Sequence, residues 1–347
     1  MRSFSCGRCG QLVFFENSVC LRCSAALGFV PSALDLVVLD DPRAAGTRTC
    51  ANATLAACNW LVEPGEPGPL CRSCALTRTR PADSDAVALP EFARAEAAKR
   101  RLVFQLLDLR LPIRDDLAFD LLSSRWAPVV TGHDEGVITI DLAESDDARR
   151  EQRRAELGEP YRTVLGHFRH EIGHYYWPIL IEPAGELERW RSLFDDERID
   201  YESAVQRHYE QGPPADWSQR YVSAYATMHP WEDWAETFAH YLHIRDTLQT
   251  AAAFGLIVAG PQATPDESLS AAPGHQDDDR RSFRSLIGDW LPLTYALNAV
   301  NRSMGRRDLY PFTLAPIVID KLSCVHERVQ SAQGPSQLER GSNTCRQ

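Results

Sequence analysis

The segment Thr163-Val-Leu-Gly-His-Phe-Arg-His-Glu-Ile-Gly-His-Tyr-Tyr-Trp177 decides how this chain is interpreted, because it contains the pattern H-E-x-x-H at residues 170–174. On a helix, residues four apart lie on one face, so the imidazoles of His170 and His174 can bind one cation. Glu171 can reach a metal-bound water without binding the metal itself. The alternative is a pair of core histidines with an unrelated glutamate between them. Apolar residues at helical spacing favour the metal site.

Two groups of cysteines precede this helix. The first consists of two C-x-x-C motifs, each of which turns two thiolates toward one point, as zinc requires. The second has the less regular spacing C-x7-C followed by C-x-x-C. Disulfides are the alternative, but they fit poorly with a chain that starts without an apolar signal peptide. We therefore expect two structural zinc sites, one at Cys6, Cys9, Cys20 and Cys23 and one at Cys50, Cys58, Cys71 and Cys74.

A catalytic zinc needs a third protein ligand, and residues 225–243 contain the best candidates. Pro230 suits the start of a helix, on which Glu232 and Glu236 share one face. We predict that Glu232 binds the zinc and that Glu236 orients a ligand imidazole. Asp233 is the main alternative ligand.

Histidine as the third ligand fits less well. Trp177 and Leu180 occupy the glycine and histidine positions of the longer motif H-E-x-x-H-x-x-G-x-x-H, which is therefore excluded. His167 suits a supporting polar role better than a ligand role. The lower-ranked ligand candidates are His229, His240 and His243.

The composition is that of an ordinary globular protein, with 44% hydrophobic and 24% charged residues in a chain of 347. The net charge of −11 argues against general nucleic-acid binding by the whole chain. No apolar run approaches the roughly 20 residues that a membrane helix needs. Because the first residues lack the apolar core of a signal peptide, we expect a cytoplasmic protein.

The segments between the motifs are predicted in outline. Residues 81–85 are expected to form a linker, and residues 92–109 an amphipathic helix. The basic run at residues 99–101 of that helix is interpreted as a solvated face. Alternating apolar residues predict a strand at 136–142, and an edge strand in this place would pair with extended substrate.

Three further expectations concern the rest of the chain. Pro178 is predicted to end the H-E-x-x-H helix, because proline lacks the amide proton that the helical hydrogen bonds need. Residues 146–157 are highly charged and are expected to form an exposed helix or lid. Residues 261–279 are expected to form a loop.

The motifs resemble those of the gluzincin metallopeptidases, in which H-E-x-x-H is followed far downstream by E-x-x-x-D/E. In that family the first glutamate binds zinc and the later acid supports a ligand histidine, which implies these roles for Glu232 and Glu236. The portion Glu232-Asp-Trp-Ala-Glu236 is also similar to that of the lethal-factor peptidases, where a tyrosine seven residues before the ligand assists catalysis. Tyr225 has this spacing, so the resemblance implies a catalytic role for it.

More of the chain resembles the bacterial zinc-binding metallopeptidases that carry an N-terminal zinc ribbon. The resembling segments are Phe14–Asn17, Cys58–Leu61, Tyr161–Trp177 and His229–Glu236. The motifs and the resemblance together predict an α+β chain. Its expected parts are a zinc-ribbon β module at 1–80, a mostly helical zincin-like domain with a short β-sheet at 88–330, and a disordered tail at 331–347.

We therefore predict a zinc-dependent metallopeptidase that hydrolyses peptide bonds in peptides or proteins through a zinc-activated water. Glu171 is the predicted general base, and Tyr225 the donor to the oxyanion. One alternative is a module whose ribbon binds nucleic acid or protein and whose zincin domain is a non-catalytic scaffold, although an intact Glu171 disfavours it. Another is a zinc amidase for a non-protein amide, with which the same residues are compatible.

Overall fold

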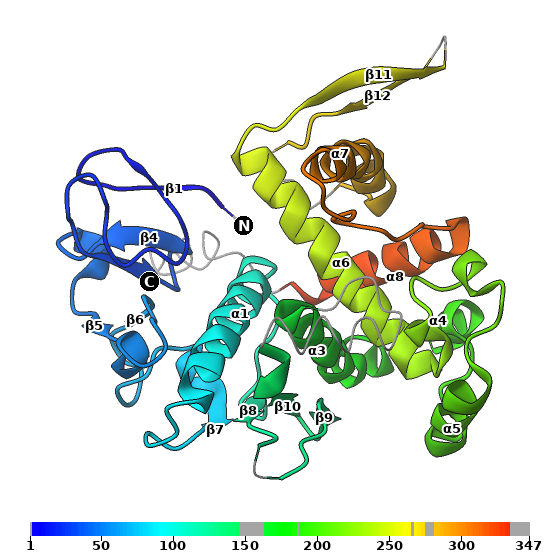
Figure 1. The fold of residues 1–347 in the computed structure, drawn as a ribbon, viewed down its shortest axis with the longest axis horizontal. Helices are drawn as coiled ribbons and strands as arrows, with labels where there is room; N and C mark the ends of the chain where they lie inside the picture. Colours follow the sequence, from blue (N-terminus) through cyan, green and yellow to red (C-terminus); the bar gives the residue numbers. More distant parts are fainter. Residues whose placement is uncertain are drawn as a thin grey trace, which may run out of the picture.

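The computed structural model describes residues 2–125, 127–145, 163–185, 187–264, 267–274 and 281–333. The helix or lid expected at 146–157, and the predicted tail from residue 334 onward, lie outside these residues. A strand-rich N-terminal region precedes a mostly helical region with a small sheet, so the predicted fold class is confirmed (Figure 1). Within the described residues, no helix is long and apolar enough to cross a membrane.

The N-terminal region consists of small antiparallel ribbons around the cysteines. The strand pairs are β1 (Phe4–Ser5) with β2 (Leu12–Val13), β3 (Leu27–Val30) with β4 (Asp35–Val38), and β5 (Arg48–Thr49) with β6 (Leu61–Val62). Two-stranded ribbons of this size are marginally stable in water by themselves. The eight cysteines lie in or against one core together with Phe15, Phe29 and Trp60. The region therefore depends on whatever holds its cysteines together.

Helix α1 (Ala88–Asp108) belongs to both regions. Phe104 packs in the core of the ribbons, with its ring centroid 5.2 Å from that of Phe15. Leu102 and Leu106 pack in the core of the helical region. Figure 1 shows α1 between the ribbons and the remaining helices. Because α1 contributes to two cores, it ties the two regions together.

The basic run on α1 is mostly buried, so the prediction that residues 99–101 form a solvated face is wrong. Lys99 is fully buried, and its Nζ lies 2.6 Å from Glu96 Oε1. Arg100 is buried as well and donates to a backbone carbonyl oxygen of the ribbon region at 2.9 Å. Only Arg101 is exposed. Buried cations need such partners, because an isolated one would lose its hydration without compensation.

The helical region contains a 4-stranded sheet of order β7-β8-β10-β9. Its strands are β7 (Thr77–Thr79), β8 (Ala118–Leu122), β9 (Gly132–Asp134) and β10 (Val137–Asp141). β7 and β8 are parallel, as are β8 and β10, whereas β9 is antiparallel to β10. The predicted strand at 136–142 exists but is an inner strand, so its expected place at a sheet edge is wrong. The short β9 forms that edge, because it folds back on β10 through a tight turn.

Two helices, α3 (Val164–Leu180) and α6 (Pro230–Ala253), pack closely in the middle of the helical region (Figure 1). Gly173 of α3 allows the close approach, since a Cβ added there would lie 2.9 Å from Ala235 Cα. Trp234 Nε1 also donates to the carbonyl oxygen of Gly173 at 2.8 Å. The two backbones are therefore held in a fixed relation, which positions the side chains between them.

Helix α3 continues through Pro178 to Leu180, so the prediction that Pro178 ends the helix is wrong by about half a turn. The amide of Ile181 still donates to the carbonyl oxygen of Trp177 at 3.0 Å. Proline removes one hydrogen bond near the end of the helix but does not prevent the last turn from closing.

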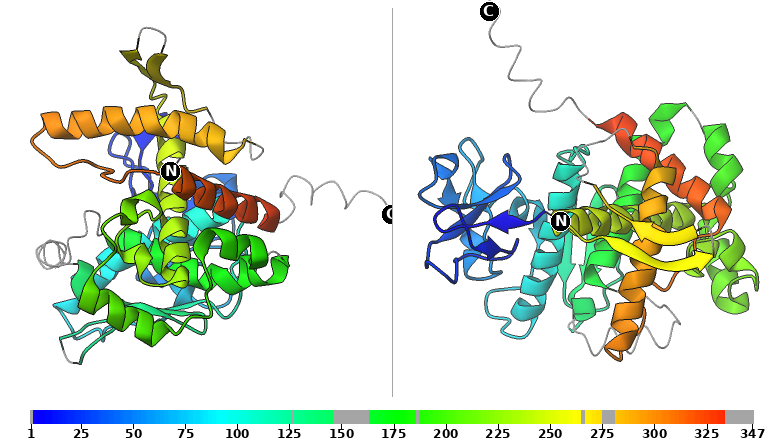
Figure 2. Two further views of the ribbon diagram at one scale, coloured as in Figure 1. Left: turned by 90° about the vertical axis from the view of Figure 1, so that its right-hand side faces the viewer. Right: turned by 90° about the horizontal axis from the view of Figure 1, so that it is seen from above.

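Further helices cover α3 and α6 (Figure 2). They are α4 (Leu187–Phe194), α5 (Tyr201–Gln211), α7 (Phe283–Ser303) and α8 (Pro316–Ala332). The loop predicted at 261–279 is wrong in its first half, because β11 (Val258–Thr264) and β12 (Glu267–Ala271) form an antiparallel hairpin. Figure 1 shows this hairpin projecting beyond α7. Gly260 and Pro261 hide the first strand from a sequence-based prediction, because both residues are unfavourable inside a sheet.

Candidate metal centre and catalytic site

The H-E-x-x-H histidines lie one turn apart on α3. The helix starts at Thr163, whose Oγ1 accepts a hydrogen bond from the amide of Gly166 at 2.9 Å. The Nε2 atoms of His170 and His174 are 3.2 Å apart. Both imidazoles are thus directed toward one point.

Helix α6 brings a carboxylate to the same point. Glu232 Oε2 lies 3.0 Å from His170 Nε2 and 3.4 Å from His174 Nε2. Around a tetrahedral zinc with bonds of about 2.0–2.1 Å, the ligand atoms lie about 3.3–3.4 Å from one another. The two imidazoles and the carboxylate therefore have the donor types and the spacing that fit a zinc ion. We call this set the histidine–glutamate group.

A second carboxylate orients His170. Its Nδ1 lies 2.7 Å from Glu236 Oε1, and Glu236 Oε2 accepts a hydrogen bond from Ser223 Oγ at 2.5 Å. Burial alone would raise the pKa of Glu236, but His170 and Ser223 lower it to about 2. With Nδ1 donating to Glu236, the lone pair on Nε2 remains available for a cation.

Glu171 is buried beside the two imidazoles, with 8% of its surface exposed. Burial raises the pKa of its carboxyl group, and the charges of His170 and His174 oppose this effect only in part. A carboxylate with a raised pKa accepts a proton more readily at neutral pH. This is the property that a general base needs.

Two tyrosines border the histidine–glutamate group. The ring centroid of Tyr225 lies 5.7 Å from that of His170, and burial raises the pKa of its hydroxyl group. Tyr201 donates its hydroxyl to Glu232 Oε1 at 2.8 Å. The sequence did not point to Tyr201 or to Ser223. Neither residue belongs to a known motif together with the glutamate that it contacts, Glu232 for Tyr201 and Glu236 for Ser223.

Asp233, the main alternative ligand, faces away from the histidines. Its Oδ2 lies 2.5 Å from the Nζ of Lys321 on α8, and both side chains are buried. Adjacent residues of a helix point about 100° apart. Glu232 therefore faces α3, whereas Asp233 faces α8.

The other candidate histidines have contacts away from the histidine–glutamate group. His229 accepts from a backbone amide and so caps α6, which explains its place before Pro230. The contacts are His167 with Glu144, His229 with the amide of Trp231, His240 with Tyr310, and His243 with Trp290.

Each group of four cysteines converges on one point. The sulfur pairs are 3.6 Å apart in the first group (Cys6–Cys23 and Cys9–Cys20) and 3.7 Å apart in the second (Cys58–Cys71 and Cys58–Cys74). Four sulfurs around zinc with bonds of about 2.3 Å lie about 3.8 Å from one another. A disulfide needs about 2.05 Å. The spacing therefore fits zinc, and all of these cysteines are free.

The second cysteine group contacts α1. Cys74 Sγ lies 3.5 Å from Glu96 Oε2, and the other oxygen of Glu96 lies 2.6 Å from Lys99 Nζ. Because Lys99 pairs with the Glu96 carboxylate, a buried ion pair rather than a lone charge borders the second cysteine group. Lys99 is thus part of the surroundings of this group and not of a solvated face.

Two family models match the chain. One, described as "Putative zinc-binding metallo-peptidase", matches residues 88–328, and one described as "zinc-ribbon domain" matches residues 3–85. The chain is 52% identical over 334 residues to "Uncharacterized protein Rv2568c" of Mycobacterium tuberculosis and to "Uncharacterized protein Mb2598c" of Mycobacterium bovis. Each of these alignments covers 94% of both chains. No solved structure matches the chain.

Proposed function

The chain belongs to the zinc-binding metallo-peptidase family and carries a zinc-ribbon domain in front, and from this premise we propose that it is a zinc-dependent peptidase. The observation that carries the proposal is the convergence of His170, His174 and Glu232, whose donor atoms lie 3.0–3.4 Å apart. Two imidazoles and one carboxylate leave a fourth tetrahedral position for water or substrate. Catalytic zinc sites have this arrangement, whereas structural sites use four protein ligands.

In this proposal, His170, His174 and Glu232 hold the zinc. Zinc bound there supplies a Lewis acid that polarises the scissile carbonyl and lowers the pKa of water to about 7. Glu236 holds the ring of His170 through Nδ1, and Tyr201 holds Glu232 through Oε1. These hydrogen bonds keep the donor atoms directed at one point before any ion binds.

Glu171 moves the proton in the proposed reaction. It accepts a proton from water as the water oxygen bonds to the scissile carbonyl carbon. It then passes this proton to the amide nitrogen as the C–N bond breaks, so that a carboxylic acid and an amine leave. Its burial and raised pKa support both transfers. Tyr225 donates its hydroxyl to the carbonyl oxygen as that oxygen becomes negative, a role supported by its position against His170.

We assign structural zinc to both cysteine groups, and their sulfur spacing of 3.6–3.7 Å supports this assignment. The proposed protein thus holds one catalytic and two structural ions. The structural ligands are Cys6, Cys9, Cys20 and Cys23 in the first group and Cys50, Cys58, Cys71 and Cys74 in the second.

Cleavage of a peptide library tests the proposal. The native protein and Glu171→Gln are each loaded with zinc and incubated with the library, and new peptide termini are identified by mass spectrometry. Glutamine keeps the shape of Glu171 but does not accept the proton, so cleavage should fall at least about a hundredfold while zinc content stays the same.

The matched control is Glu188→Gln, which makes the same change on the exposed side of α4 and should cleave as the native protein does. Equal cleavage by Glu171→Gln would remove Glu171 from the mechanism. Hydrolysis of small amides without cleavage of any peptide would show that the protein is an amidase and not a peptidase.

A further inference from the structure

The two cysteine groups differ in how close they lie to solvent. In the first group, Cys9 and Cys23 are partly exposed. Their two companions, Cys6 and Cys20, are buried. All four cysteines of the second group are buried, each with at most 3% of its surface exposed. Of the two groups, the first therefore has cysteines that solvent reaches.

The chain around the two groups differs in the same way. Leu21, which lies between Cys20 and Cys23, has 93% of its surface exposed. The second group instead lies against α1, where Cys74 Sγ is 3.5 Å from Glu96 Oε2 and Glu96 is fully buried. A small oxidant thus reaches the first group directly, but reaches the second only if the contact with α1 opens.

An exposed arginine precedes each of the partly exposed cysteines. Arg8 stands before Cys9, and Arg22 stands before Cys23. Each arginine also lies near the opposite motif. Arg8 is close enough to Cys23 for their charges to interact, and a guanidinium nitrogen of Arg22 lies 3.5 Å from the carbonyl oxygen of Cys9. Positive charge beside a partly exposed cysteine favours the thiolate, which is the form that reacts with oxidants.

Each partly exposed sulfur already contacts a buried sulfur of the other motif. Cys9 Sγ lies 3.6 Å from Cys20 Sγ. Cys23 Sγ lies 3.6 Å from Cys6 Sγ. A disulfide needs about 2.05 Å, so a small shift joins either pair. The second sulfur of a disulfide is therefore in place before an oxidant arrives.

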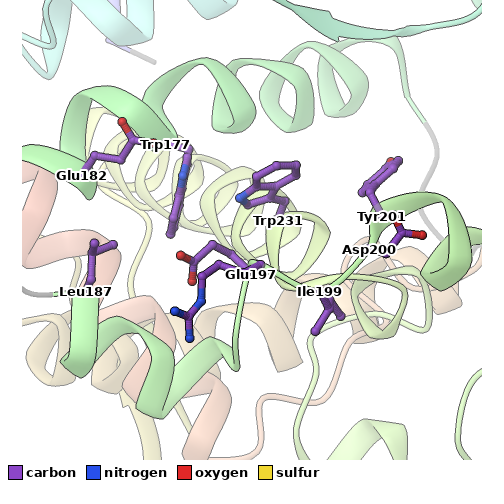
Figure 3. Close-up of a pocket in the computed structure, with 9 residues that line it drawn as sticks. Trp177, Glu182, Leu187, Glu197, Ile199, Asp200, Tyr201 and Trp231 are labelled. Carbon is purple, nitrogen blue, oxygen red and sulfur yellow. The ribbon is translucent and has the colours of Figure 1, made fainter.

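The histidine–glutamate group has no sulfur to offer to the same oxidant. Its three members are two imidazoles and a carboxylate. Figure 3 shows the pocket whose lining residue Tyr201 donates to Glu232, with Trp177 and Trp231 in its walls. None of the described residues that line this pocket contains sulfur. An oxidant of thiolates that enters it finds no target there.

We propose that the first cysteine group is an oxidation site, at which a peroxide converts zinc-binding thiolates into disulfides and releases the ion. This inference rests on the zinc assigned to this group and does not depend on the peptidase activity. The assignment supplies the thiolate form, because a thiol that binds zinc is deprotonated.

The reaction has two steps. The thiolate of Cys9 or Cys23 attacks one oxygen of hydrogen peroxide, the O–O bond breaks, and hydroxide leaves as a sulfenic acid forms. The neighbouring buried thiolate then attacks this sulfur, a second hydroxide leaves, and the disulfide bond forms. The two thiolates lose two electrons in total, and the peroxide gains them.

Release of the ion would open the first ribbons selectively. The small strands there depend on their cysteines being held together. Phe15 of this region packs on Phe104 of α1, with ring centroids 5.2 Å apart, so opening would uncover this part of α1. The second group and the helical region would stay folded.

Treating the zinc-loaded native protein with hydrogen peroxide tests the proposal. Zinc is counted by elemental analysis first, and its release is then followed with a colorimetric chelator against a sample without peroxide. Remaining thiols are alkylated, and disulfides are located by mass spectrometry. The disulfides Cys9–Cys20 and Cys6–Cys23 should form at least about tenfold faster than any oxidation of the second group, with release of about one zinc per chain.

Two outcomes would overturn the proposal. One is oxidation of both groups at the same rate, and the other is loss of zinc without a disulfide in the first group. If the first group holds no zinc before peroxide is added, the zinc assignment fails and the proposal fails with it. None of these results bears on cleavage of peptides, so the peptidase proposal is tested separately.

A pair of double variants tests the role of exposure. Histidine replaces cysteine in many zinc sites, so it removes a thiolate and keeps a ligand. Cys9→His with Cys23→His removes both partly exposed thiolates, and peroxide should release this zinc at least about tenfold more slowly.

The matched control, Cys6→His with Cys20→His, has the same ligand types but keeps the partly exposed sulfurs, which lie within 4.8 Å of each other. It should release zinc within about threefold of the native rate. Equal rates in the two double variants would show that exposure does not select the reacting cysteines and would overturn the proposal. Disulfide mapping in the native protein decides the question if either variant fails to hold zinc.

Discussion

The first cysteine group and the histidine–glutamate group both fit zinc, but their surroundings hold them in opposite ways. The strands β1 and β2 beside the first cysteine group contain two residues each. Such strands do not persist without a central ion or another link. His170 and Glu232 instead project from helices of 17 and 24 residues. Trp234 and Phe238 fill the contact between these helices and are fully buried.

Under the proposed function, this difference would separate a metal needed for folding from a metal needed for chemistry. Around the first cysteine group, the proposed ion would add to a small hydrophobic core that contains Phe15, Phe29 and Trp60. Around the histidine–glutamate group, helix packing and the hydrogen bonds of Glu236 and Tyr201 place the ligands beforehand. The surroundings of the second cysteine group are intermediate. This group lies in the ribbon region, but Cys74 contacts Glu96 of α1, which also packs against the helical region.

Replacing a ribbon cysteine should have the largest effect, because zinc contributes roughly 10–16 kcal/mol of apparent binding free energy in small zinc domains. Cys6→Ser should unfold the first ribbon and leave α1 and the helical region folded. Cys71→Ser should also loosen α1, since the second group contacts Glu96. Limited proteolysis with mass spectrometry measures which segments open.

Cys324→Ser is the control, since this buried cysteine of α8 lies outside both groups, and it should retain all zinc. Identical proteolytic fragments from Cys6→Ser and Cys71→Ser would show that the two cysteine groups do not differ in this way.

Glu232→Ala should separate metal binding from folding. The variant should lose one zinc per chain and keep the two ribbon ions, and hydrolysis should fall at least about a hundredfold. Its circular dichroism spectrum should remain that of the native protein, because helix packing places the histidines. Zinc is counted by elemental analysis. A full complement of zinc in Glu232→Ala would exclude Glu232 as a ligand.

Asp233→Ala should give the opposite result at the neighbouring position. Removing this carboxylate leaves the ammonium of Lys321 buried without its partner, which costs about 3–5 kcal/mol of unfolding free energy. Zinc content should not change. Urea unfolding measures the loss, and adding Lys321→Met should restore part of it. Loss of zinc in Asp233→Ala would place this residue in the metal site.

Glu236→Ala should have the smallest of these effects. Without its hydrogen bond partner, His170 is less well oriented, and zinc affinity should weaken by roughly ten- to a hundredfold. Titration against a competing chelator measures the affinity. Glu236→Gln still accepts a hydrogen bond and should lose less. Unchanged affinity in Glu236→Ala would mean that packing alone orients His170.

Much of the fold class followed from local signals in the sequence. The two C-x-x-C motifs and the short apolar runs predicted a ribbon module, and helical periodicity predicted the long helices. The hairpin of β11 and β12 did not follow, because Gly260 and Pro261 are unfavourable within strands. The family resemblance rested on several separate segments, and the matches to the metallo-peptidase and zinc-ribbon models confirmed it.

The two lysines of the chain illustrate what local signals miss. Lys99 and Lys321 are both buried, each against a carboxylate, at 2.6 Å from Glu96 and 2.5 Å from Asp233. Composition alone places lysine in solvent, which is correct for most lysines. Glu96 was visible three residues before Lys99 on the same helix, whereas Asp233 is separated from Lys321 by 88 residues.

The sequence by itself determined which residues share a face of the same helix. The shared face of His170 and His174, and that of Glu232 and Glu236, follow from the repeat of the α-helix, which is the same in every fold. Only the tertiary structure decided that Glu232 faces α3 while Asp233 faces α8, and that Tyr201 contacts Glu232. These relations join residues far apart in the chain. They depend on how the helices pack, through the side chain of Trp234 and the absence of one at Gly173.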